Sequence, residues 1–231
     1  MGMLNPPKWR LPMLKVKLYQ VGGIISKDFI YDNLSHYMYS DEIGFGFELV
    51  DDHDDNLILN FVERVIKKLE IVSIDGEVSE IETVSYIKVK FGIRFNTKYG
   101  LYVINPPRSM KYPYEMIRTI FGSNSGLKPV EIDLKVLLNV ICKKYDHVIK
   151  SMALSNIQCD PNTIAKTKIA SSKDLNPFYL ENYSETPAVI DTVHFVVNGI
   201  DTELSRTGRF RVHEDNLQDF MFILDVNANK F

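Results

Sequence analysis

The segment Val84–Phe95 reads VSYIKVKFGIRF, and its side chains alternate in character over most of its length. Val89 and Phe91 are apolar, whereas Lys88 and Lys90 beside them are charged. Successive side chains of a β-strand point to opposite faces, so this period of two predicts a strand with one buried and one exposed face.

Similar alternation, or short apolar runs between turn residues, predicts further strands along the chain. Asp75-Gly76 and Asn198-Gly199 are dipeptides typical of tight hairpin turns. Residues 57–69 fit both a helix and a strand, and the sequence leaves them undecided. The other predicted strands cover residues 14–21, 45–50, 71–74, 101–104, 130–134, 148–157, 189–197, 200–204, 209–212 and 221–226.

Helical patterns are few. Ser26 can cap a helix that follows it, Pro113 can begin one that ends before Gly122, and residues 137–145 have helical spacing. Residues 158–187 are polar, interrupted by proline and least patterned. Strands that come in runs joined by turns predict an α+β fold, with a mostly antiparallel sheet built from hairpins and a few packed helices.

Composition places the chain among ordinary globular proteins. Apolar residues make up 45% of its 231 residues and charged residues 25%. Three prolines among the first twelve residues predict an extended N-terminal leader over residues 1–12, followed by a single α+β domain over residues 13–231. No apolar run is long enough for a membrane-spanning helix. Cys142 and Cys159 make no disulfide framework, which favours reduced thiols and a cytoplasmic location.

The charges are unevenly distributed although the net charge is only −3. Residues 28–63 hold ten acidic and no basic residues, and residues 64–173 hold eighteen basic against ten acidic. From residue 174 onward the acidic residues again dominate. A basic middle segment can face a polyanion, or it can be neutralised by the acidic flanks after folding. Both interpretations stay open.

Basic residues near aromatic rings suggest nucleic-acid contacts, because they suit phosphate binding and base stacking. Acidic residues flank the arginines and offer ion pairs as the alternative explanation. The candidate nucleic-acid-binding residues are Arg206, Arg209, Arg211, Lys166, Lys168 and Lys173.

Glu131, Asp133 and Lys135 have the acid-x-lysine spacing of metal-dependent nucleases, provided that they lie on a strand. There the carboxylates hold magnesium and the lysine steadies the attacking water or the phosphate. The separate upstream aspartate of such sites has no clear counterpart. Alternating charge on an exposed strand explains the same residues.

Four aspartates, Asp51, Asp52, Asp54 and Asp55, form an acidic run that can bind a hard cation. A helix-loop-helix calcium loop that starts at Asp51 would need glycine at the sixth position and glutamate at the twelfth. Neither is present, so a solvated turn is favoured and no metal is expected.

The segment Leu101–Arg108 ends in Asn-Pro-Pro-Arg. It resembles the strand-end motif of amino-group DNA methyltransferases, in which asparagine, two prolines and an aromatic residue hold a flipped base. Arg108 stands where that family has the aromatic residue, and no cofactor-binding glycine turn follows a strand. The resemblance implies a parallel sheet with Asn105 at the carboxyl end of a strand.

No nucleophile elbow, phosphate loop or helical pair of metal-binding histidines occurs in the sequence. We therefore expect a non-catalytic binding or assembly module without a cofactor, acting through a protein partner or self-association. The alternatives are a nucleic-acid-associated protein, which includes the metal-dependent nuclease, and the methyltransferase.

Overall fold

The computed structural model describes residues 12–23, 25–76 and 78–228. Within these ranges the chain forms five α-helices and eleven β-strands, and the paired strands are antiparallel. The predicted α+β class with a mostly antiparallel sheet is therefore confirmed.

Two compact units make up the described chain. Residues 12–20, 97–99 and 128–228 form the first unit, and residues 21–96 and 100–127 form the second. Each unit has strands, helices and a buried apolar core of its own.

Predictions about chain organisation have different outcomes. The predicted leader over residues 1–12 lies outside the described residues apart from Pro12. A single domain over residues 13–231 stays a prediction beside the division into two units. Among the described residues, no helix has the length and apolar character needed to cross a membrane.

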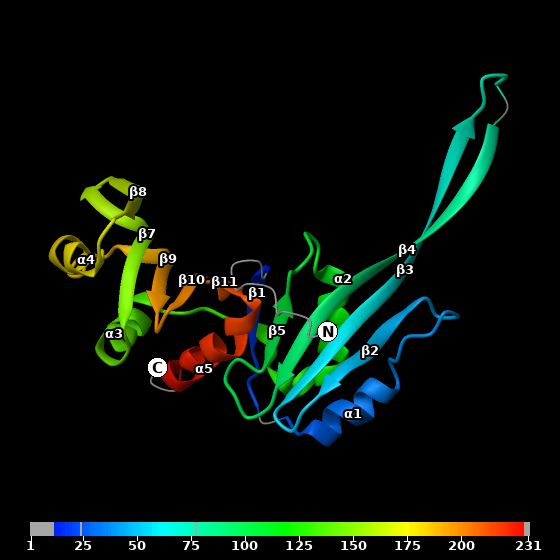
Figure 1. Ribbon diagram of the computed structural model, residues 1–231, viewed down its shortest axis with the longest axis horizontal. Coiled ribbons are helices and arrows are strands. Elements are labelled where there is room, and N and C mark those ends of the chain that lie inside the picture. Colours follow the sequence, from blue (N-terminus) through cyan, green and yellow to red (C-terminus); the bar gives the residue numbers. More distant parts are fainter. Residues whose placement is uncertain (1–11, 24, 77, 229–231) are drawn as a thin grey trace, which may run out of the picture. The chain divides into compact units, whose positions relative to one another are not determined.

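The second unit contains four antiparallel strands in the order β2, β3, β4, β5, together with two helices. The ring of Tyr112 lies 5.6 Å from that of Phe61, and Phe61 lies 5.5 Å from Phe47, so one helix packs on the β2–β3 surface. The elements are α1 (Lys27–Ser35), β2 (Phe45–Asp52), β3 (Asn56–Val72), β4 (Val78–Arg94), β5 (Leu101–Ile104) and α2 (Lys111–Phe121) (Figure 1).

The first unit has its strands in the order β1, β11, β10, β9, β7, β8, with the short β6 paired to the end of β1. Three helices accompany them. The strands are β1 (Met13–Gln20), β6 (Lys128–Pro129), β7 (His147–Asp160), β8 (Thr163–Ala170), β9 (Val189–Val197), β10 (Ile200–Ser205) and β11 (Arg209–His213). The helices are α3 (Leu134–Lys144), α4 (Asn176–Asn182) and α5 (Leu217–Ala228).

Helix α5 covers one face of the first unit's strands. The ring of Phe220 lies 5.1 Å from Phe210 and 6.2 Å from Phe195, and all three side chains are buried. Residues next to Phe210 in β11 point to the opposite face, because side chains alternate along a strand. Arg209 and Arg211 therefore lie on the face away from α5, where both are exposed.

The helix cap, the helix end and the hairpin turn that the sequence predicts are confirmed. The Ser26 hydroxyl caps α1 by accepting a hydrogen bond from the Phe29 N–H at 3.2 Å. Gly122 ends α2 with a φ of 75°, a value that residues other than glycine rarely adopt. Asn198 and Gly199 both have positive φ at the β9–β10 turn.

Two predicted strands are wrong, and one open question is answered. Residues 57–69 form part of β3. Residues 130–134 form no strand, because Asp133 instead caps α3. Residues 221–226 belong to α5, since a short apolar run has the same pattern in a buried helix as in a strand. Residues 158–187, the least patterned segment of the sequence, contain all of β8 and α4, whose exposed faces conceal their periodicity.

Candidate assembly arm and basic surface

β3 and β4 continue beyond their neighbouring strands as a two-stranded ribbon (Figure 1). β2 pairs with β3 only as far as Glu63, and β5 pairs with β4 only from Lys90 onward. We call residues 64–86 the arm. Within the described chain, no third strand pairs with the arm on either edge. Its strands extend for about 30 Å at the usual rise per residue.

A tight turn and a regular ladder form the arm. Gly76 has a φ of 83° and donates its N–H to the Ser73 carbonyl oxygen at 2.9 Å. The strands then pair without interruption from Val72–Val78 down to the sheet. An isolated two-stranded hairpin is only marginally stable in water. The arm therefore lacks the covering that normally stabilises such a ribbon.

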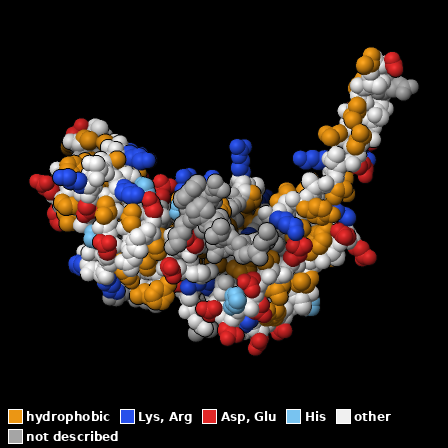
Figure 2. Space-filling view, in the orientation of Figure 1, with side chains coloured by type: hydrophobic (Ala, Val, Ile, Leu, Met, Phe, Trp, Pro, Cys, Tyr) orange, Lys and Arg blue, Asp and Glu red, His pale blue; other side chains and the backbone are white. Residues whose placement is uncertain are grey.

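Apolar side chains are exposed along the whole arm (Figure 2). Residues opposite each other in the two strands share a face, so Ile66 and Val84 lie on one face and Leu69 and Ile81 on the other. Ile74 at the tip is fully exposed. Large exposed apolar residues of the arm are Ile66, Leu69, Ile71, Val72, Ile74, Val78, Ile81, Val84 and Tyr86.

The two faces of the arm differ in charge. Lys68 lies 3.3 Å from Glu82 and 3.7 Å from Glu80 on one face. Glu70 lies directly opposite Glu80 on the same face, and such a like-charge pair destabilises a hairpin. Among the described strand residues, the other face carries Leu69, Ile71 and Ile81 and has Lys67 as its charged residue. The arm thus combines one nearly neutral apolar face with one face whose acidic charge exceeds its basic charge.

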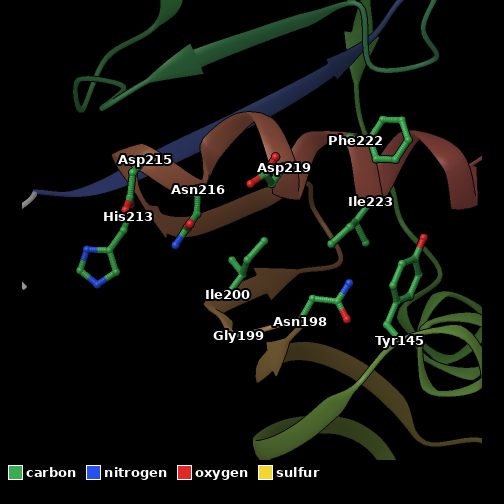
Figure 3. A pocket seen from close by; sticks show the side chains of 10 residues that line it. All are labelled: Tyr145, Asn198, Gly199, Ile200, His213, Asp215, Asn216, Asp219, Phe222 and Ile223. Carbon is green, nitrogen blue, oxygen red and sulfur yellow. The ribbon is translucent and has the colours of Figure 1, made fainter. Parts of the chain in front are cut away.

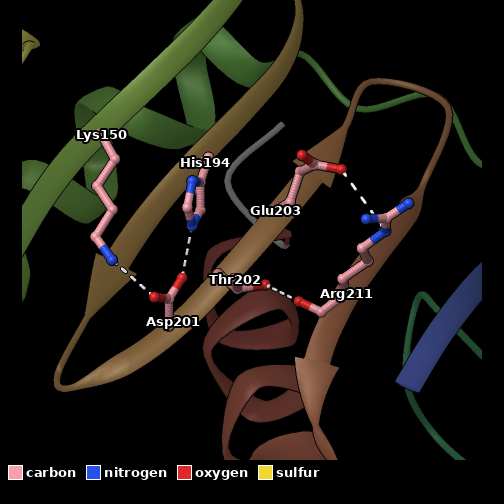
Figure 4. A network of polar contacts seen from close by, with 6 residues as sticks. All are labelled: Lys150, His194, Asp201, Thr202, Glu203 and Arg211. Carbon is pink, nitrogen blue, oxygen red and sulfur yellow. Dashed lines mark hydrogen bonds and ion pairs between the residues drawn. The ribbon is translucent and has the colours of Figure 1, made fainter. Parts of the chain in front are cut away.

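A polar network lies on the open face of the first unit (Figure 4). The Lys150 ammonium donates to one Asp201 carboxylate oxygen at 2.7 Å, and His194 Nε2 lies 2.6 Å from the other. Partial burial by itself raises the pKa of Asp201, but the hydrogen bonds from Lys150 and His194 outweigh it and lower this pKa. Because all three side chains are partly exposed, we assign this network to sheet stability.

Basic residues of β1 and β11 lie on the same open face. The register places Lys17 opposite Arg209 and Lys15 opposite Arg211. We call these four residues the basic ladder. The sequence pattern indicated the two arginines and not the two lysines, although the alternation of the lysines with Val16 in a predicted strand was a signal for them.

The other candidate nucleic-acid-binding residues lie apart from the ladder. Lys166 and Lys168 are exposed on β8, four strands away from β11, which is about 19 Å at the usual strand spacing. Lys173 follows β8 and is also exposed. Arg206 lies in the β10–β11 connection, where Asp191 holds its Nε at 3.0 Å.

The nuclease candidates do not share a strand face. Glu131 is exposed in the segment before α3, and its carboxylate lies 3.8 Å from Arg206. Asp133 accepts a hydrogen bond from the Val136 N–H at 3.1 Å as the cap of α3. Lys135 donates to the Ser184 carbonyl oxygen. The arrangement on a strand that motivated the nuclease hypothesis is absent from these residues.

The acidic run lies at the β2–β3 connection. Lys27 Nζ lies 2.5 Å from Asp52 and His53 lies 3.1 Å from Asp51. Asp54 and Asp55 are exposed. In the described part of the chain, no group of three or more histidine, cysteine or acidic side chains has the arrangement needed to hold a metal ion.

Asn105, the first residue of the Asn-Pro-Pro motif, has a φ of 47° and directly follows β5. β5 pairs with β4 in the antiparallel direction. The methyltransferase resemblance requires a parallel sheet at this point. The strand arrangement around Asn105 therefore differs from the one that the resemblance implies.

A hollow of about 660 Å³ lies in the first unit beside the β9–β10 turn (Figure 3). Asn198 and Tyr145 line one side of it, and Asp219 and Phe222 of α5 line the other. Asp219 and Phe222 are exposed. Water can therefore reach the Asp219 carboxylate in this hollow.

Comparison with known proteins adds no identification. The chain matches no family model, and no curated protein matches it either.

Proposed function

We propose that this protein is an assembly module whose arm pairs with the arm of a second copy. The observation that supports the proposal is a ribbon with exposed apolar residues on both faces and no paired neighbour on either edge in the described chain. Exposed apolar strand edges are templates for pairing with another chain. Each arm face has an area of about 300 Å², given a length near 30 Å and two strand widths.

Pairing along an edge accounts for apolar residues on both faces at once. A strand added beside β3 brings side chains next to those of β3 on each face, because cross-strand neighbours contact each other on both sides of a sheet. A partner that binds one face would leave the other face exposed. The free edge also supplies backbone N–H and C=O groups for the new ladder.

The sequence of the β3 edge is complementary to itself. In an antiparallel pair centred on Leu69, Lys68 lies opposite the partner's Glu70, and Ile66 lies opposite the partner's Val72. Each such pair occurs twice in a two-fold symmetric dimer. Opposite charges and apolar pairs placed directly across a ladder stabilise it.

The β4 edge lacks this complementarity. An antiparallel pair centred on Ile81 would place Glu80 opposite the partner's Glu82, and centring on Glu82 would oppose two glutamates. Like charges at these positions destabilise a ladder. Pairing through β3 also brings the partner's Lys68 beside Glu70, which offsets the repulsion between Glu70 and Glu80 within one arm. We therefore assign the dimer contact to β3.

Two matched double variants test this assignment. Ile66→Lys with Val72→Lys places lysines opposite each other at the β3 edge of the dimer. Val84→Lys with Val78→Lys changes their cross-strand partners, which lie on the same face of the arm but on β4. We expect sedimentation velocity to show a dimer for the wild type and the β4 variant, and at least tenfold weaker association for the β3 variant.

Equal effects of the two variants would mean that the arm binds through a face and not through the β3 edge. A monomeric wild type at concentrations of 100 µM, which would place Kd above this range, would refute self-assembly altogether. Far-ultraviolet circular dichroism of all three proteins checks that the lysine substitutions leave the fold intact.

A further inference from the structure

The basic ladder concentrates positive charge on the first unit. Lys15 and Lys17 on β1 lie directly opposite Arg211 and Arg209 on β11, so two like-charge pairs follow one another along the two strands. Like charges directly opposite each other destabilise an antiparallel ladder. At the Lys17–Arg209 pair the fold therefore retains an unfavourable arrangement that an anion would convert into a favourable one.

Lys17 and Arg209 form the part of the ladder with least compensation. Within the described chain, neither side chain has a carboxylate partner at ion-pair distance. The Lys17 ammonium donates to the Thr207 carbonyl oxygen. Burial, together with the charge of Arg209, lowers the pKa of Lys17. A bound anion would stabilise the charged form of Lys17 and offset this repulsion.

The neighbouring arginines are balanced by acids to different degrees. Arg206 lies 3.0 Å from Asp191 and 3.8 Å from Glu131, so much of its charge is neutralised. Arg211 lies 3.9 Å from Glu203, at the outer limit of an ion pair. Positive charge thus remains in excess at Lys17 and Arg209, in a chain whose acidic residues outnumber its basic residues.

A hollow of about 460 Å³ lies beside this excess charge. Lys17, Arg206 and Arg209 line it together with Thr207, while Glu131 contributes one carboxylate. Its volume is in the usual range for small-molecule sites, and it is large enough for a phosphate group with the adjoining sugar. The described lining contains no aromatic side chain on which a base could stack.

We propose that the basic ladder binds the phosphate backbone of a nucleic-acid strand, independently of base sequence. The charges form two parallel rows, because Lys15 and Lys17 are about 7 Å apart along β1 and Arg209 and Arg211 repeat this spacing on β11. Repeated charges along both rows suit successive phosphates of a chain better than one isolated anion. Cationic side chains without stacking partners contact phosphates and carry no sequence information.

Fluorescence anisotropy with a labelled twenty-nucleotide single strand of mixed sequence tests this proposal. We expect the wild type to bind at 50 mM salt, and Lys17→Glu and Arg209→Glu each to bind at least tenfold more weakly. Lys143→Glu removes an exposed lysine of α3 that is no part of the ladder and should change Kd by less than twofold. The slope of log K against log salt should fall by about 0.7 for each phosphate contact that is lost.

A neutral variant separates an effect on binding from an effect on folding. Arg209→Ser removes the charge without adding an acid, and loss of the Lys17–Arg209 repulsion should leave its melting temperature unchanged or higher. Weaker oligonucleotide binding by this equally stable variant supports the proposal. Because the ladder and the arm lie in different units, loss of the dimer contact and loss of the ladder are distinguishable, and the ladder variants are the ones that should weaken oligonucleotide binding.

Other outcomes would overturn the proposal. Wild-type protein that does not bind at 50 mM salt, or Arg209→Glu protein that binds as tightly as the wild type, would exclude the ladder as a nucleic-acid site. Complete displacement by 5 mM inorganic phosphate would indicate a single-anion site. Ladder-dependent binding to vesicles containing phosphatidylserine, without oligonucleotide binding, would assign the surface to a membrane.

Discussion

Exchanging two charges on the arm gives the sharpest test of the proposed dimer. In the pair centred on Leu69, the contacts between Lys68 and the partner's Glu70 occur twice. Lys68→Glu opposes two glutamates at both places, and Glu70→Lys opposes two lysines. Each single variant therefore replaces two attractive contacts by two repulsive ones.

The expected loss follows from the number of these contacts. An opposite-charge pair across a ladder contributes about 0.5 kcal/mol, and a like-charge pair costs a similar amount. Exchanging two pairs then weakens the dimer by about 2 kcal/mol, which is roughly 30-fold in Kd. The effect should shrink at high salt, because these side chains are exposed.

Recovery of dimerisation by compensating charges distinguishes strand pairing from general damage to the arm. The double variant Lys68→Glu/Glu70→Lys again opposes unlike charges and should dimerise as the wild type does. An equimolar mixture of the two single variants should form a heterodimer, because two glutamates on one chain then face two lysines on the other. Analytical ultracentrifugation, with one variant carrying a fluorescent label, measures this mixed species.

The effect of each single variant on the stability of its own arm supplies an internal control. Lys68→Glu removes the ion pairs with Glu80 and Glu82, whereas Glu70→Lys replaces the repulsion from Glu80 by attraction. The two single variants should thus move arm stability in opposite directions while both weaken the dimer. Unchanged association of Glu70→Lys, or no recovery in the mixture, would refute pairing through the β3 edge.

Two further predictions concern a close contact at Gly92 in the second unit and the pH dependence of stability through Asp201 in the first unit. Gly92→Ala should lower the free energy of unfolding by about 1–3 kcal/mol in urea titrations, because its Cβ would lie 2.0 Å from the Tyr102 ring. A melting curve that matches the wild type would contradict this close contact. Asp201→Asn should lower stability at neutral pH by roughly 0.5 kcal/mol or less, since the carboxylate is partly exposed. The folded pKa of Asp201 lies below its unfolded value, so wild-type protein loses this contribution as pH falls through the folded pKa, and the variant has none to lose. Equal differences between the two proteins at pH 7 and pH 2.5 would argue against the role of Asp201.

The sequence by itself determined the fold class and many of its turns. Alternation in β1, β4 and β9, the Ser26 cap and the Asn198-Gly199 turn are local features, set by side chains and neighbouring backbone. Such features can be predicted without knowing the remainder of the chain, because strand geometry and capping depend on residues close in sequence.

Tertiary structure decided which strands are covered and which charges meet. Residues 57–69 fitted two structures until β4 supplied a partner, and the arm became a candidate surface only because β2 and β5 end before it does. The ladder exists because Lys17 and Arg209, 192 positions apart, are brought opposite each other by the register of β1 and β11. Pairing between distant segments depends on the burial of the whole core, which no local pattern of residues contains.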